Sequence, residues 1–305
     1  MEITTYQQGI MNEITRSAIY LLFQLKDTYD KDTLKADFEV LQKLVDGHSA
    51  VLGLGQHIIA QVKKENPFEI YTPKGKTAEL APETRCDLAL WLKNDDEGVL
   101  MHQARQLIKV LSQRFTCTDI TRSCTYLARK AKGENINHDL SGFVDGTANP
   151  KAAKRIKAAI IQTGDRSLIG SSCWALQKWQ HDFGWLDKAG KQAKETLIGR
   201  SLTDNHEFKN NPPFSHISRT EQESFDPEAF MWRRSMPWVN DRLEGGLMFS
   251  AFMTDFYPFK AQLKRMTGEI DGIFDGLFTF SKIEYTTFLW CPPFRKGKLD
   301  FALFA

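Results

Sequence analysis

The sequence lacks the features that mark membrane, exported and nucleic-acid-binding proteins. No apolar run approaches the roughly 18 residues needed for a membrane-spanning helix. The N-terminal stretch MEITTYQQGI has no basic and apolar leader of the kind used for export. Lys and Arg number 40 against 38 Asp and Glu, so the net charge of +2 provides no field to hold a nucleic acid. We therefore expect a cytoplasmic protein that binds neither membranes nor nucleic acid.

Cysteine and histidine are few and are not spaced as metal ligands. The 5 cysteines form an odd set without a C-x-x-C pair: Cys86, Cys117, Cys124, Cys173 and Cys291. This argues against a disulfide framework or a structural zinc site and favours reduced thiols. The 7 histidines show no H-x-x-H or H-E-x-x-H spacing, so zinc hydrolysis is not indicated.

The first part of the chain alternates strand-like and helix-like patterns. With 305 residues, of which 42% are hydrophobic, the chain can bury a substantial core. The periodicity of apolar residues predicts strands at 17–25, 50–55, 87–93 and 121–129, with helices at 34–45 and 100–111. The order is β-α-β-β-α-β, the split β-α-β pattern.

The same pattern returns in the second part. We expect strands at 167–179, 229–236, 247–253 and 286–291, with helices near 185–199, after Pro258 and at 271–279. The predicted fold is α+β, with duplicated ferredoxin-like halves at 1–140 and 141–305, antiparallel sheets and peripheral helices. An exposed sheet of this kind usually finds a partner, so a homodimer or higher homo-oligomer is expected. The polar stretches 130–139 and 202–215 are predicted as long loops.

The sharpest local motif is SGFVDGTANP at 141–150, in which Asp145 stands between Gly142 and Gly146. A D-G pair of this kind is typical of a turn. The two apolar residues inside the motif also allow a loop packed against a binding site. The motif alone leaves both interpretations open.

Two further motifs place charged or titratable residues among apolar ones. His216 lies in PPFSHISRT, where a core histidine and a ligand are both possible. The strand FMWRRSMPW contains Arg233 and Arg234, which should face opposite sides, one inward and one toward solvent. The inward arginine needs an anion, supplied by a buried salt bridge or by a ligand. Ser235 should share the face of Arg233.

The order of these motifs resembles that of the dye-decolorising peroxidase family, particularly its shorter, bacterial, cytoplasmic type. The resemblance spans about residues 85–305, and the earlier part matches only in pattern. It is carried by SGFVDGTANP, IGR at 198–200, SHISRT, WRRSMPW, GLMFSAF at 246–252 and DGIFDGLFTF at 271–280. It implies an enzyme that reduces hydrogen peroxide through a ferryl intermediate and oxidises dyes, phenols or other small electron donors.

The resemblance also assigns residues to a haem b pocket, mainly in the C-terminal half. His216 would be the proximal ligand of the iron, with Asp275 or alternatively Asp271 accepting its Nδ1 hydrogen. On the distal side, Asp145 would be the acid–base group, Arg233 the fixed positive charge and Ser235 a weaker participant, because several relatives have asparagine there. Burial would raise the pKa of Asp145 and the arginine would lower it. The expected haem propionate partners are Arg200, Asn149 and Arg234.

Other functions and the route of electrons stay open at this point. Bulky donors would pass electrons through aromatic residues such as Trp232, Trp238 or Tyr257, each of which is otherwise ordinary core packing. The main alternative is a haem-binding protein that handles porphyrin or releases iron, and a haem sensor is a third. Chlorite dismutation would share the fold, but Asp145 favours a peroxidase. No extension after LDFALFA is seen that would dock the chain into a capsid-like compartment.

Overall fold

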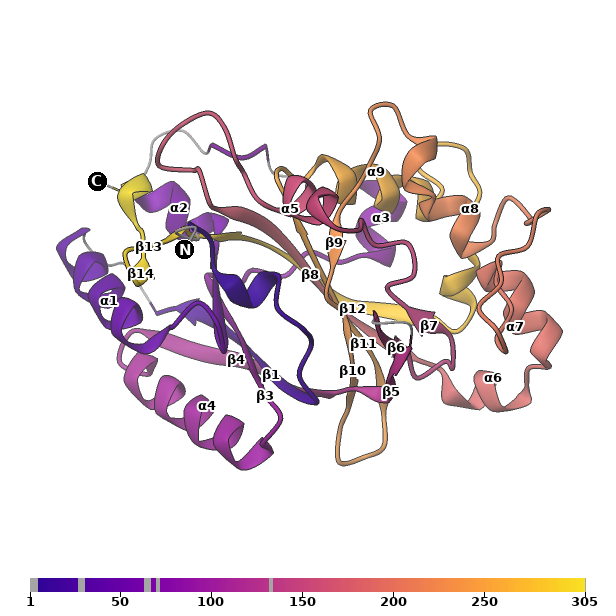
Figure 1. The fold of residues 1–305 in the computed structure, drawn as a ribbon, viewed down its shortest axis with the longest axis horizontal. Helices are drawn as coiled ribbons and strands as arrows, with labels where there is room; N and C mark the ends of the chain where they lie inside the picture. Colours follow the sequence, from indigo (N-terminus) through magenta and orange to yellow (C-terminus); the bar gives the residue numbers. More distant parts are fainter. Residues whose placement is uncertain (1–4, 27–30, 63–66, 70–71, 132–133, 305) are drawn as a thin grey trace.

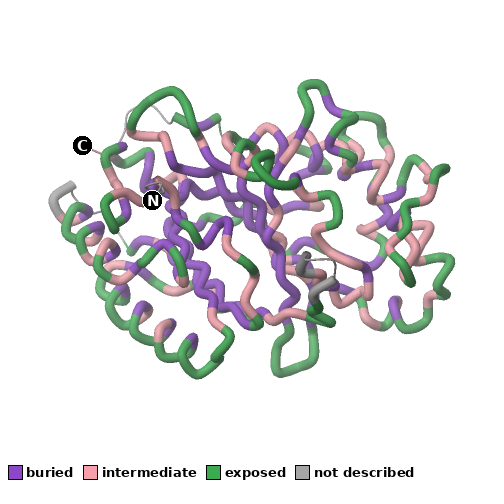
Figure 2. Tube along the Cα trace, viewed as in Figure 1, coloured by how far each residue is buried: buried purple, intermediate pink, exposed green. Residues whose placement is uncertain are grey.

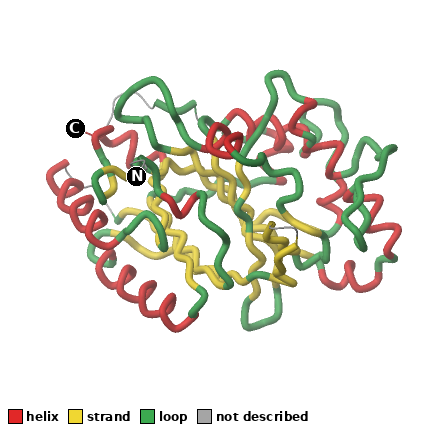
Figure 3. The backbone as a smooth tube through the Cα atoms, viewed as in Figure 1, coloured by secondary structure: helices red, strands yellow, loops and turns green. Residues whose placement is uncertain are grey.

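The fold is centred on one large antiparallel sheet. The computed structural model describes residues 5–26, 31–62, 67–69, 72–131 and 134–304. Within them, a 9-stranded sheet has the order β10-β4-β1-β3-β2-β12-β8-β11-β9. Its strands gather in the middle of the molecule, and the helices lie around them (Figures 1 and 3).

The first four strands form a ferredoxin-like repeat. Their order in the sheet is β4-β1-β3-β2, and both crossovers contain a helix. The elements are β1 (Ser17–Leu25), α1 (Lys31–Leu44), β2 (Ala50–Gly55), β3 (Leu88–Asn94), α4 (Glu97–Leu111) and β4 (Phe115–Cys124).

The second repeat has the equivalent order, β12-β8-β11-β10. The short strand β9 (Trp232–Arg233) also pairs with β11, directly before β10. The elements are β8 (Ser172–His181), α6 (Phe183–Lys188), α7 (Lys191–Ile198), α8 (His216–Thr220), β10 (Met236–Val239), β11 (Gly245–Met253), α9 (Tyr257–Met266) and β12 (Ser281–Cys291). The α+β, duplicated ferredoxin-like fold predicted from the sequence is confirmed.

The two repeats close into a ring. Strand β12 pairs with β2, and β10 pairs with both β11 and β4. Each repeat therefore covers the edges of the other. Most of the sheet is covered on both faces, but one side of β4 is exposed, with Ile120 55% exposed. The homo-oligomer expected from an exposed sheet stays a prediction.

Closure explains why strands such as β1 and β2 are apolar almost throughout. On β1, Tyr20 and Leu22 belong to an inner cluster, whereas Leu21 and Phe23 belong to an outer cluster under the helices. Successive residues of a strand face opposite sides, so both sides must be apolar when both are buried. Figure 2 shows the buried segments following the strands, while α1 and α4 keep an exposed outer side.

Several boundaries differ from those expected. The helix predicted at 185–199 is two helices, because the chain is extended at Ala189 and Gly190. The strand predicted at 121–129 ends at Cys124, and β5 (Tyr126–Ala131) then leaves for a small separate sheet. Of the helix predicted at 271–279, only the 3₁₀ helix η3 (Gly276–Thr279) forms.

The small sheet replaces part of an expected loop. Within 130–139, β5 pairs with β6 (Glu134–His138), which in turn pairs with β7 (Val144–Asp145). The boundary expected at residues 140 and 141 thus falls in the turn between β6 and β7, and the division into halves there stays a prediction. The other elements are η1 (Gln8–Ile10), α2 (Gln56–Val62), α3 (Gly75–Leu80), α5 (Ala153–Ala159), η2 (Gln222–Ser224), β13 (Phe294–Arg295), β14 (Lys298–Leu299) and η4 (Ala302–Phe304). Of the helices in the described ranges, none combines the length and apolar character needed to cross a membrane.

Candidate active site

A cavity lies on the outer face of the second repeat. Its residues come from β8, β11, α9, the β6–β7 hairpin and the segments around α8 and β9, and all lie between positions 139 and 277. Most of the wall is apolar, as in sites that bind flat organic groups. The polar residues in the wall are Asp139, Ser141, Asp145, Gln177, His181, His216, Thr220, Arg233 and Gln262.

His216 is the first residue of α8 and is held in a fixed orientation. Ser215 caps the helix, its hydroxyl accepting a bond from the Ser218 amide. The Nδ1 atom of His216 lies 2.8 Å from Oδ2 of Asp275, whose side chain is fully buried. Because Nδ1 is engaged, Nε2 is the ring nitrogen left for a ligand in the cavity.

Asp275, and not Asp271, reaches His216. Asp275 caps η3, and its Oδ1 accepts a bond of 2.8 Å from the Leu277 amide. Asp271 instead binds the guanidinium of the buried Arg219 at 2.7 and 2.8 Å. The sequence left both carboxylates open because it predicted a helix through this segment.

Asp145 lies in β7, where it pairs with Asn137 of β6. Its Oδ1 accepts a bond of 2.7 Å from the Gly146 amide, whose positive φ of 79° suits glycine. Burial raises the pKa of the Asp145 carboxyl above its ordinary value, and the charge of Arg233 offsets only part of this shift. Of the two opposing effects expected from the sequence, burial is therefore the larger.

Arg233 reaches the cavity from β9 and is fixed through its backbone. The Asn149 side chain accepts a bond from the Arg233 amide and donates one to its carbonyl, both at 2.9 Å. The Nε atom of Arg233 is buried and has no hydrogen-bond partner among the described residues. Burial lowers the pKa of the guanidinium, and the negative charge of Asp145 opposes that change.

Arg234 does not face solvent, contrary to the expectation from strand alternation. It is only 8% exposed, on the inner side of the ring, and donates to the carbonyl of Asn12. Burial lowers the pKa of Arg234 to about 10. Alternation itself holds, because Arg233 and Arg234 do face opposite sides. The side that Arg234 faces, however, is the buried interior of the ring, where its guanidinium lies against Trp232.

Ser235 and Arg200 are not part of the cavity wall. Ser235 is buried, and its hydroxyl lies 3.4 Å from the Ser250 amide. Arg200 donates to the Asn205 carbonyl and pairs with Glu207. The positive charge of Arg200 is nevertheless close enough to lower the pKa of Arg233. Arg234 is not part of the wall either. The roles predicted for Ser235, Arg200, Asn149 and Arg234 stay predictions.

The sequence did not single out two residues in the cavity wall, Asp139 and His181. The Nε2 atom of His181 lies 2.9 and 3.0 Å from the two carboxylate oxygens of Asp139. Burial acts to raise the pKa of Asp139, but bonding to His181 and Ser141 outweighs it, so this pKa lies below its ordinary value. Asp139 lies two positions before the first residue of the SGFVDG motif, whereas no sequence feature connects His181 with it.

The three aromatic residues expected to carry electrons have different hydrogen-bond partners. The indole N–H of Trp238 donates to the backbone carbonyl of Trp179, a wall residue, at 2.7 Å. Trp232 precedes Arg233 and donates to the Ile10 carbonyl. Tyr257 begins α9, and its hydroxyl donates to the Pro227 carbonyl.

Comparison with known proteins places the chain among peroxidases. The family model Dyp-type peroxidase, C-terminal, matches residues 136–296. The dye-decolorizing peroxidase of Rhodococcus erythropolis is 25% identical over 298 residues, covering 92% of this chain and 85% of that protein. The Mycobacterium tuberculosis enzyme of the same name is 31% identical over 140 residues, 45% of this chain and 39% of that protein.

Two solved structures share the fold. A Dyp-type peroxidase protein of Shewanella oneidensis aligns with a TM-score of 0.80 at 24% identity, over 95% of this chain and 97% of that one. A DypB variant of Rhodococcus jostii in complex with haem aligns with a TM-score of 0.77 at 22% identity, over 92% and 94%.

Proposed function

The chain belongs to the Dyp-type peroxidase family, whose members are haem peroxidases, and from this premise we propose that it reduces hydrogen peroxide at a haem b bound by His216. The electrons would come from dyes, phenols or other small donors. The observation that carries the proposal is the cavity with His216 and its buried partner Asp275 in the wall, together with Asp145 and Arg233.

The residues present fit a haem. The cavity wall is mostly apolar, with a few polar groups that converge on it, as is typical of cofactor sites. A histidine whose Nδ1 is bonded to a carboxylate is a strong axial ligand through Nε2. The bound haem would supply the iron that exchanges electrons with peroxide. The structure of the Rhodococcus jostii DypB variant is a complex with haem, which is consistent with this assignment.

Asp145 would move the proton of the reaction. Its Oδ1 accepts the Gly146 amide, which leaves Oδ2 to take a proton from the first oxygen of peroxide and to return it to the leaving oxygen. Because burial raises its pKa, the carboxyl holds a proton more readily than an exposed aspartate does.

Arg233 would hold a fixed positive charge beside this carboxyl. A guanidinium keeps its proton, so it can stabilise negative charge on the departing oxygen but cannot act as a base. Its unpartnered Nε is available to a ligand in the cavity. Asn149 acts on the reaction through the backbone of Arg233, and Arg200 is the cation we assign to a haem propionate. Ser235 keeps a minor distal role in the proposal.

Electrons from bulky donors would enter through Trp238. Its indole is bonded to the backbone of Trp179, and Lys178 lies 4.5 Å from its ring centroid. This connection from the inner face of the ring to the cavity wall favours Trp238 over Trp232 and Tyr257. A cytoplasmic location, a homo-oligomeric assembly and passage through a high-valent intermediate belong to the same proposal.

The decisive experiment is an absorption spectrum of the haem-reconstituted protein before and after addition of peroxide. A histidine-ligated haem spectrum that changes on addition of stoichiometric peroxide and returns when guaiacol is added supports the proposal. Transfer of haem to an acceptor protein, or loss of iron from the porphyrin, without turnover of guaiacol would favour the porphyrin-handling alternative.

A further inference from the structure

The cavity wall contains a second carboxylate for which the peroxide chemistry has no use. Asp139 is bound through both oxygens to Nε2 of His181, at 2.9 and 3.0 Å. Its side chain is 13% exposed and that of His181 is 3% exposed. Burying two titratable groups costs free energy unless the groups are paired, and here they are paired with each other.

His181 is held in one orientation by hydrogen bonds and by neighbouring aromatic rings. It is the last residue of β8, and its register partner is Ser281, the first residue of β12. Its Nδ1 lies 2.8 Å from the Ser281 hydroxyl, so both ring nitrogens are engaged. The rings of Phe183 and Phe280 lie 6.3 and 5.9 Å from the imidazole. The imidazole is therefore a rigid anchor point.

Asp139 is also hydrogen-bonded to the turn that leads to Asp145, and so connects this turn to His181. Its carboxylate accepts the amide of Ser141 at 3.1 Å and also the Ser141 hydroxyl. Its backbone amide donates to the Phe143 carbonyl, and its carbonyl accepts the Gly142 amide, both at 2.9 Å. The chain then returns as β7, in which Asp145 pairs with Asn137.

Asp139 also acts on Asp145 through its charge. Arg233 and His216 lower the pKa of Asp145 and Asp139 raises it. Arg234 and Tyr20, on the inner side of the ring, are also close enough to interact with the Asp145 charge. The negative charge of Asp139 raises the pKa of Asp145, while Asp139 itself stays ionised through His181 and Ser141. Two carboxylates whose environments push their pKa values apart take different roles, and Asp145 is the one left to titrate.

We propose that Asp139 and His181 are positioning residues for Asp145: the pair ties the β6–β7 turn to strands β8 and β12 and keeps a fixed negative charge near the reacting carboxyl. This inference rests on the acid–base role proposed for Asp145. Neither residue needs to touch peroxide.

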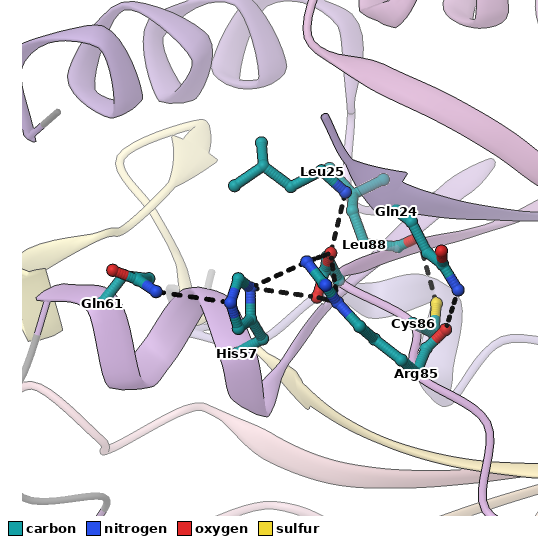
Figure 4. A network of polar contacts seen from close by, with 8 residues as sticks. Gln24, Leu25, His57, Gln61, Arg85, Cys86 and Leu88 are labelled. Atoms are coloured by element: carbon teal, nitrogen blue, oxygen red, sulfur yellow. Dashed lines mark hydrogen bonds and ion pairs between the residues drawn. The ribbon is translucent and has the colours of Figure 1, made fainter. Parts of the chain in front are cut away.

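The test uses Asp139→Asn, Asp139→Glu and His181→Gln in the full chain. The control is His57→Gln, because His57 also lies beside an aspartate but outside the cavity wall, its Nδ1 lying 3.4 Å from Asp87 (Figure 4). Three quantities are measured: amide hydrogen exchange of residues 139–146, the titration of the ¹³C-labelled Asp145 carboxyl in the haem-free protein, and the pH dependence of the reaction with peroxide after haem loading.

His181→Gln should accelerate amide exchange in the turn about 10- to 100-fold, the effect of losing a charge-assisted hydrogen bond. Asp139→Asn should move the titration of Asp145, and with it the acidic limb of the rate profile, about one pH unit lower. Asp139→Glu keeps the negative charge, so the titration of Asp145 should stay close to that of the parent. His57→Gln should change none of the three quantities.

Two results together would overturn the inference: amide exchange in His181→Gln at the parental rate, and a titration of Asp145 in Asp139→Asn that equals the parental one. The pair would then contribute only to the packing of the core. Failure of the proposed function is recognised separately. If the haem-loaded parent does not react with peroxide, while Asp139→Asn still moves the Asp145 titration, the positioning role stands and the peroxidase proposal falls.

Discussion

The Nδ1 atom of His216 and the Oδ2 atom of Asp275 lie 2.8 Å apart, across 59 positions of the chain. The carboxylate is fully buried, and its other oxygen is taken by the Leu277 amide. Asp275 therefore has one orientation, and it fixes the orientation of the imidazole in turn. An axial ligand held in this way donates more electron density than a free imidazole.

Replacing Asp275 tests this relationship. Asp275→Asn should retain haem, weaken its binding or the activity about 10- to 100-fold, and raise the iron reduction potential, because His216 would donate less electron density. Spectroelectrochemical titration measures the potential. Asp271→Asn is the control, since Asp271 binds Arg219 instead and should leave the potential unchanged. An unchanged potential in Asp275→Asn would remove Asp275 from this role.

Removal of His216 should abolish stable haem binding. No other histidine lines the cavity except His181, whose two ring nitrogens are engaged with Asp139 and Ser281, so among the described wall residues none can replace the ligand. The haem content and Soret band of His216→Ala measure the loss. His206→Ala, in an exposed loop, should match the parent. Parental haem content in His216→Ala would show that the ligand lies elsewhere.

The pH dependence of the peroxide reaction separates the two distal groups. The proposed base works when ionised, so the rate should rise with pH through the pKa of Asp145, which burial places above its ordinary value. Asp145→Asn should slow the reaction about 10²- to 10⁴-fold and flatten this limb. Arg233→Leu should slow it about 10²- to 10³-fold and move the limb to higher pH, because the charge that lowers the Asp145 pKa is lost.

Stopped-flow absorbance from about pH 4 to 8, a range that spans the ordinary aspartate pKa and above, measures both effects. If Asp145→Asn reacts as fast as the parent at every pH and Arg233→Leu does not, the acid–base role belongs to no carboxylate at this position. Cleavage assisted by the arginine alone would then replace it.

Asn149 should contribute to stability through the backbone of Arg233. Asn149→Ala removes both 2.9 Å bonds and should lower the free energy of unfolding by about 1–3 kcal/mol, the cost of leaving buried backbone groups unpaired. Urea denaturation measures the change. Asn94→Ala, which removes one local bond to the Asp96 amide, is the comparison and should cost less. Equal losses in the two variants would argue against a clamp on Arg233.

Lys93 gives the haem-free protein a specific pH dependence of stability. Its side chain is buried, and burial lowers its pKa from 10.5 to about 7. Between these two values the unfolded chain holds a proton that the folded chain has released, so stability should rise with pH, by at most about 1.4 kcal/mol per pH unit. Lys93→Met should remove this slope from urea denaturation measured between about pH 7 and 10, whereas Lys109→Met on the exposed side of α4 should keep it. A slope that survives in Lys93→Met would assign it to other groups.

Local patterns in the sequence predicted the repeats well. The apolar runs at 17–25 and 50–55 coincide with β1 and β2, and the 3.6-residue spacing from Leu100 to Leu111 lies within α4. Periodicity reports burial, which here is strong on both faces of strands such as β1 and β2 and alternates on β4. It does not report how two sheets join, so ring closure and the burial of Arg234 were not predicted.

The site was predicted as far as motifs extend. Asp145, His216 and Arg233 all line one cavity, as expected from their order in the chain. His181 was missed because its partner Asp139 is 42 positions away and their contact depends on the end of β8 meeting the β6–β7 turn. Pairings of this kind are set by tertiary geometry, which no local spacing encodes.

Ring closure also determines when the protein can complete its fold during synthesis. The strand that joins the repeats is β12, which ends at Cys291 and is the last strand of the large sheet to be synthesised among the described residues. Until β12 has been made, the edge of β2 has no partner and the Ser281 hydroxyl that braces His181 is not in place. Domains fold as units once their parts are available, so we expect the cavity to be completed only after β12 has left the ribosome. A cofactor would then be bound by chains that already contain β12 and not by shorter nascent ones.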